Sequence, residues 1–174
     1  MLNDSTPQSF RDLPKNELHA HLNGSISKDT ALQLSQRTFS HDFHPRLCED
    51  VERQYEQNTT HLVLADFFPL FTLIYQLTDD VESVTIATEK VIEDFAKDNV
   101  VYLELRSTPR ATAGMSRKDY VEAMTQGIKK CQHLNIIVRI ILTLDRRGKR
   151  EDWAYSSSSH HLLVELFYKS PIPS

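Results

Sequence analysis

Short apolar runs alternate along the chain with longer stretches of helical spacing. The short runs predict three strands, at residues 15–22, 100–106 and 136–144. The second and third, VVYLELR and IIVRIILTL, are nearly continuous in apolar residues, as strands of a parallel sheet covered on both faces are. Pro14 and the Asn23-Gly24 pair bound the first run, so this strand ends in a turn.

Between these strands, apolar residues recur at three- and four-residue intervals and predict helices at residues 29–36, 62–77, 81–97 and about 117–131. A Ser25-Ile-Ser27 cap, an Asp79-Asp80 pair and Ser116 precede three of these helices. Residues 38–60 are polar, so we expect a long irregular excursion there. Phe67, Phe68 and Phe71 could line a pocket, although an aromatic stripe at helical spacing is more often core.

The order of strand, helices, strand, helix and strand indicates βαβ units and a parallel sheet. A (β/α)8 TIM barrel needs roughly 250 residues, so two interpretations are open: a small three-stranded α/β domain, or an incomplete (β/α)8 barrel. The change of character after Gly148, into a serine run and a His pair, favours the second. We therefore expect residues 1–148 to be the N-terminal part of a barrel and residues 149–174 to be a divergent, irregular tail.

The composition narrows the function classes. A net charge of -4 argues against a protein that coats nucleic acid or a membrane surface. No signal peptide or spanning segment is visible, and Cys48 and Cys131 lie far apart without metal-type spacing. We expect a cytosolic protein without nucleic-acid or membrane partners.

His19-Ala20-His21 is the first candidate for chemistry. Residues i and i+2 of a strand share a face, so both imidazoles can address one ion such as zinc. The pair also lies at the end of a first strand, where barrel enzymes place their chemistry. The alternative is that both are ordinary polar strand residues. His160 and His161 are adjacent, so in a strand they would face opposite ways, and we interpret them as residues of the tail.

Three ordered blocks carry a resemblance to a known family. They are LPKNELHAHLNGS at residues 13–25, YLELRSTPR at 102–110 and LDRRG at 144–148. Together they resemble the adenosine/AMP deaminase family, and within it the branch that acts on N6-methyl-AMP. The resemblance covers about residues 11–148.

The resemblance implies a metal-dependent hydrolase: a (β/α)8 barrel that binds one zinc ion at the C-terminal ends of its strands. His19 and His21 would be the first two ligands, and zinc would activate water for attack on the purine C6. The implied reaction converts N6-methyl-AMP to the hypoxanthine product, with AMP and adenosine as further candidate substrates. The implied partner is a small purine nucleotide, and we expect the complete protein to be a monomer.

The family also needs a third His ligand, a Glu proton donor, another His and an Asp ligand. Nothing in residues 149–174 matches these groups, so we identify no catalytic acid or base in this chain. We expect the 174-residue chain alone to be inactive. The alternative is a non-catalytic truncated isoform that acts as an interaction scaffold, because a three-stranded sheet exposes its edges.

The resemblance also implies substrate contacts at His21, Asn23, Tyr75, Ser107, Thr108, Pro109, Arg110 and Asp145. Adenosine deaminases generally carry Asp at the position of Asn23, and an uncharged amide there favours a phosphate. Arg110 could grip that phosphate; the alternatives are that Asn23 is a turn residue and Arg110 a solvated loop charge. Asp145 could equally be a turn or capping residue.

Two further positions bear on the pocket. Tyr75 departs from the family pattern, which has His near the pocket lid, but it keeps a hydroxyl at similar reach. Glu104 and Arg106 share one face of the second strand, opposite Leu103 and Leu105, and we expect this polar pair to point into the barrel interior.

Overall fold

The computed structural model describes residues 12–37, 47–60 and 67–143. Within these ranges the elements, in chain order, are β1 (Lys15–His21), α2 (Lys28–Ser35), α3 (Leu47–Thr60), α4 (Phe67–Leu77), α5 (Val81–Lys97), β2 (Val100–Ser107), α6 (Arg117–Lys130) and β3 (Ile137–Leu142).

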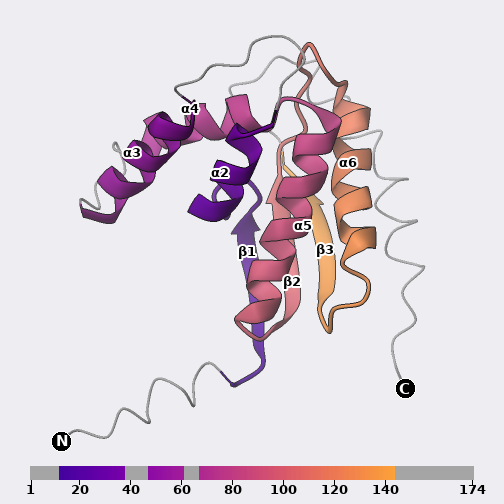
Figure 1. Ribbon diagram of the computed structural model, residues 1–174. Coiled ribbons are helices and arrows are strands. Elements are labelled where there is room, and N and C mark those ends of the chain that lie inside the picture. Colours follow the sequence, from indigo (N-terminus) through magenta and orange to yellow (C-terminus); the bar gives the residue numbers. More distant parts are fainter. Residues whose placement is uncertain (1–11, 38–46, 61–66, 144–174) are drawn as a thin grey trace, which may run out of the picture.

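The three strands form one parallel sheet in the order β1-β2-β3 (Figure 1). Tyr102 of β2 pairs with Ile137 of β3, and the ladder continues regularly to Ser107 and Leu142. The prediction of parallel strands is confirmed. Because parallel strands end at the same edge of the sheet, His21, Ser107 and Leu142 lie at one end.

Helices α5 and α6 lie side by side along one face of the sheet (Figure 1). Leu103 and Leu105 of β2, which point to that face, are fully buried. Glu104 and Arg106 alternate with these leucines along β2, so they lie on the other face, where both are only partly buried. The Oε2 atom of Glu104 lies 3.8 Å from the Nη2 atom of Arg106. An apolar face under helices and a polar opposite face fit part of an α/β barrel, with the polar face as its interior.

Capping residues fix where the helices begin, as the sequence predicts. The side chains of Ser27 and Asp80 accept hydrogen bonds from the first turns of α2 and α5. Ser116 and Asp119 form a reciprocal capping box at the start of α6. The predicted boundaries of these three helices agree with the structure to within about one residue.

The expectation of an irregular segment over residues 38–60 is wrong for its second part, because Leu47–Thr60 is helix α3. Val51 is fully buried, and the Tyr55 hydroxyl donates to the Ile26 carbonyl at 2.6 Å. These two apolar residues, one helical turn apart, attach an otherwise polar helix to the core. Residues 38–46 lie outside the described residues.

The other boundaries differ little. The predicted helix at residues 62–77 begins at Phe67 in the described part of the chain, and residues 62–66 lie outside it. The third strand is shorter than predicted, and Leu144 lies outside the described residues, as does the predicted tail at 149–174. Across the described ranges, no helix is both long enough and apolar enough to cross a bilayer.

Candidate metal and substrate site

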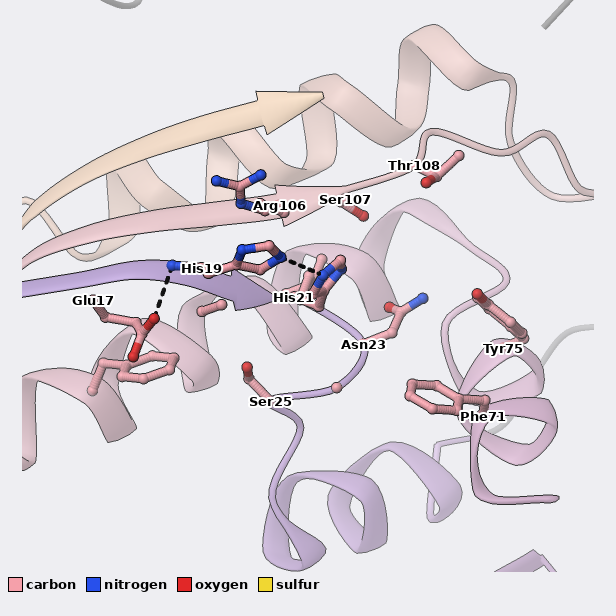
Figure 2. Close-up of a pocket in the computed structure, with 14 residues that line it drawn as sticks. Glu17, His19, His21, Asn23, Ser25, Phe71, Tyr75, Arg106, Ser107 and Thr108 are labelled. Atoms are coloured by element: carbon pink, nitrogen blue, oxygen red, sulfur yellow. Dashed lines mark hydrogen bonds between the residues drawn. The ribbon is translucent and has the colours of Figure 1, made fainter. Parts of the chain in front are cut away.

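An open cavity of about 540 Å³ lies where β1 and β2 end, and helix α4 forms its opposite wall (Figure 2). It brings together predicted residues from three separate segments. These are His19 and His21 of β1, Asn23 of the following turn, Tyr75 of α4, and Ser107 and Thr108 at the end of β2.

The two histidines face each other. Their Nε2 atoms lie 3.2 Å apart, and the ring centres are 5.2 Å apart with the planes tilted by 42°. The prediction that both imidazoles share a face is confirmed. Partial burial, followed by the nearby His19 and Arg106, lowers the pKa of His21, which favours the neutral imidazole that binds metals.

This geometry suits two ligands of one ion. Imidazole nitrogens bound to a tetrahedral zinc at about 2.0–2.1 Å lie about 3.3 Å from each other, close to the observed separation of Nε2 atoms. No group of three or more His, Cys, Asp or Glu side chains that could hold a metal occurs among the described residues. Among the described residues, the facing His19 and His21 rings are therefore not joined by a third donor of these types.

Asn23 follows the histidines in a turn anchored to the sheet. The backbone N–H of Leu22 donates to the Arg106 carbonyl, and that of Ser25 donates to the Leu22 carbonyl. The Asn23 side chain extends into the cavity toward Tyr75 (Figure 2). Its Oδ1 is buried and has no hydrogen-bond partner among the described residues. An uncharged amide with unused bonding capacity thus lies in the cavity wall.

The end of β2 presents two hydroxyls. Ser107 is buried, and its Oγ lies 2.8 Å from the hydroxyl of Tyr120 in α6. Burial raises the pKa of Tyr120, so this hydroxyl stays protonated. The Oγ1 of Thr108 is exposed and lies 2.8 Å from that of Thr143. Pro109 is buried and does not line the cavity.

Arg110 lies behind the α4 wall rather than in the cavity lining. Its Nη2 donates to the Tyr75 carbonyl at 3.0 Å, to the Thr78 Oγ1 at 2.8 Å and to the Thr78 carbonyl. Burial lowers the pKa of this guanidinium. A direct contact between Arg110 and a phosphate stays a prediction, and the structure gives the side chain a second role at the end of α4.

Sequence reasoning did not assign Glu17 or Ser25 to the site, yet both line the cavity. The period-2 pattern places Glu17 on the face of His19 and His21, which could have indicated it. Phe71 also lines the cavity, whereas Phe68 is exposed. Asp145 lies outside the described residues.

Comparison with known proteins identifies the family to which this chain is similar. A family model described as adenosine deaminase matches residues 14–166. The N6-methyl-AMP deaminase-L of Xenopus laevis is 43% identical over 85% of this chain and 42% of its own length. The N6-mAMP deaminase of Arabidopsis thaliana is 39% identical over 82% of this chain and 46% of its own length. The chain thus spans less than half the length of these relatives.

Solved structures with a similar fold include proteins of the same kind. An ADAL–IMP complex superposes with a TM-score of 0.74 at 39% identity, covering 87% of this chain and 46% of that one. An Arabidopsis ADAL complexed with GMP has a TM-score of 0.74 at 38% identity, covering 92% and 48%. A zinc-bound amidohydrolase at 20% identity, with a TM-score of 0.72 over 94% of this chain and 44% of that one, shares the fold.

Proposed function

We propose, because this chain belongs to the adenosine deaminase family, that residues 1–148 form the N-terminal part of a zinc-dependent deaminase of purine nucleoside monophosphates. The observation that carries the proposal is the pair of facing imidazoles, with Nε2 atoms 3.2 Å apart, in a cavity at the carboxyl ends of parallel strands.

His19 and His21 would hold the zinc ion, and the remaining ligands would come from other strands. When bound, zinc supplies an activated water nucleophile near neutral pH. The chain's own contribution is to hold both rings on one face of β1, with His21 favoured in its neutral form.

The substrate we propose is N6-methyl-AMP, converted to IMP, with AMP and adenosine as candidates to be compared. Two observations support a monophosphate. The side chain at position 23 is an uncharged amide, which does not repel a phosphate. Relatives are named N6-methyl-AMP deaminases, and similar structures are described as complexes with IMP and GMP.

The other residues would orient the nucleotide. Asn23, Tyr75 and Thr108 present polar atoms to the cavity, and Ser107 shares a hydrogen bond with Tyr120 at its edge. Two further proposed contacts, Pro109 and Arg110, do not line the cavity, and Asp145 lies outside the described residues. Arg110 would have to release the carbonyls of Tyr75 and Thr78 to reach a phosphate.

The 174-residue chain by itself would not deaminate, because two imidazoles leave half of a tetrahedral zinc shell unfilled. A non-catalytic scaffold is the second candidate function. Large apolar side chains are exposed on both outer strands, Leu18 of β1 by 55% and Ile137 of β3 by 44%, and these favour association with another protein.

A fusion protein tests the proposal. Residues 1–148 are joined to the part of the mouse N6-methyl-AMP deaminase that follows its matched segment, and hydrolysis of N6-methyl-AMP, AMP and adenosine is followed beside the 174-residue chain. We expect the fusion to prefer N6-methyl-AMP and the short chain to be inactive. A folded fusion that hydrolyses none of the three substrates contradicts the proposal.

A further inference from the structure

Strand β1 carries one extra residue next to the His pair. Glu17 pairs with Leu103 of β2, and Ala20 pairs with Leu105, so three steps along β1 match two along β2. This is a β-bulge, and its extra residue falls at Leu18 and His19. The bulge removes the Leu18–His19 peptide from the regular ladder.

Two side chains form hydrogen bonds with the N–H and the carbonyl of that peptide. The carboxylate of Glu17 accepts a hydrogen bond from the His19 backbone N–H at 2.8 Å, drawn as a dashed line in Figure 2. The Nη2 of Arg106 donates to the Leu18 carbonyl at 3.2 Å. The carbonyl and the N–H belong to one peptide unit and point in opposite directions, so the unit is held from both sides.

The two histidines are therefore held in different ways. His21 pairs with Arg106 in the regular ladder, and the next N–H along the chain, that of Leu22, donates to the Arg106 carbonyl. His19 has no ladder pairing of this kind, and the direction of its side chain follows from the orientation of the Leu18–His19 peptide. Both Glu17 and Arg106 line the cavity, close to the rings.

We infer that Glu17 and Arg106 are positioning residues for His19: they lock the bulge peptide and so aim the His19 ring at the point where the His21 ring also converges. The part of this inference that concerns zinc affinity rests on the proposed function. The part that concerns peptide orientation does not, and it can be tested without metal.

The first experiment measures hydrogen exchange in the zinc-free 174-residue chain by NMR. Glu17→Ala removes the acceptor, and we expect the His19 amide to exchange about tenfold faster or more, while the Leu22 amide is unchanged. Glu17→Gln keeps an oxygen acceptor and should restore most of the protection. Asn16→Ala, at an exposed neighbouring position of β1, is the matched control and should change neither amide.

Equal acceleration of the His19 and Leu22 amides in Glu17→Ala would show a general loosening of β1 and overturn the inference. So would an unchanged His19 amide. A Glu17→Gln variant that behaves as Glu17→Ala would also contradict it, because the hydrogen bond would then not be the cause.

The second experiment titrates the same variants with zinc alone and follows the His19 and His21 ring resonances. We expect Glu17→Ala and Arg106→Ala to weaken binding about 10- to 100-fold, as loss of an outer-shell partner does, and Glu17→Gln and Arg106→Lys to weaken it less. If zinc binds none of the chains, the original included, two imidazoles alone do not hold the ion, and the exchange result alone decides whether Glu17 positions His19.

Discussion

The guanidinium carbon of Arg110 lies 4.6 Å from the centre of the Tyr75 ring, and the same group donates to the Tyr75 carbonyl at 3.0 Å. The centre of the Tyr120 ring lies 5.7 Å from the same guanidinium carbon. Because Tyr120 shares a hydrogen bond with Ser107, Arg110 joins the α4 wall of the cavity to the β2 wall. Its charge also complements the C-terminal end of α4.

Arg110→Ala should therefore lower stability. Losing charge-assisted hydrogen bonds to the Tyr75 and Thr78 carbonyls costs about 1.5–3 kcal/mol, measured as the free energy of unfolding in urea. Arg110→Lys should lose less. In the active fusion, a role in the wall predicts that Arg110→Ala lowers kcat/KM for N6-methyl-AMP and N6-methyladenosine equally. A selective loss of the monophosphate would instead support direct phosphate binding.

Asn23→Asp tests the substrate class. A phosphate carries nearly two negative charges near neutral pH, and two like unit charges 4 Å apart at an effective dielectric of 20 repel by about 4 kcal/mol. Even about 1.4 kcal/mol is a tenfold effect. We expect kcat/KM for N6-methyl-AMP to fall at least tenfold more than that for N6-methyladenosine in the fusion. Equal losses would mean that Asn23 serves the turn.

Gly127 sets the approach of α6 to α5. A Cβ at this position would lie 2.7 Å from the Thr88 Cβ and 2.8 Å from the Thr85 carbonyl oxygen. Gly127→Ala gains about 1 kcal/mol of helix propensity, but overpacking costs about 1–3 kcal/mol. We expect a net loss of stability in urea unfolding, while Gln126→Ala on the exposed face stays within about 0.5 kcal/mol. A more stable Gly127→Ala would show that the helices are free to separate.

Cys131 should be a slow nucleophile. Burial, and then the nearby carboxylates of Glu89 and Glu93, raise its pKa to about 11, so at pH 8 only about one thiol in a thousand is ionised. Alkylation by iodoacetamide, followed by mass spectrometry, should be about a hundredfold slower in the folded chain than in urea. Between pH 8 and 10 the folded rate should rise about tenfold per pH unit. Equal alkylation rates in the folded chain and in urea would contradict the burial of Cys131.

The strands and helices with a clear apolar period were predictable from the sequence, because each such period fits only one kind of secondary structure. The β2 run places Leu103 and Leu105 on one face and Glu104 and Arg106 on the other, and the structure has the same division. Helix α3 was missed because Val51 and Tyr55 are its clearest apolar contacts, and two positions do not establish a helical period.

The site was predictable as a set of residues but not as a geometry. Residue order and period 2 place His19 and His21 together with Ser107, and the structure confirms this. The sequence did not reveal the bulge that gives Glu17 its contact, because a bulge shifts the alternation of a strand and β1 has only one buried residue, Ala20, by which to follow that alternation. Nor does residue type reveal whether the Arg110 guanidinium faces a ligand or a helix carbonyl.

Zinc bound per chain, measured on the same samples as kcat/KM for N6-methyl-AMP, tests the central claim most directly. In the fusion protein we expect about one zinc per chain, with zinc and activity lost together in His19→Ala and in His21→Ala, while Asn16→Ala keeps both. A His19→Ala or His21→Ala fusion that retains a full zinc content and normal kcat/KM would contradict the assignment of this pair as the metal ligands of a deaminase.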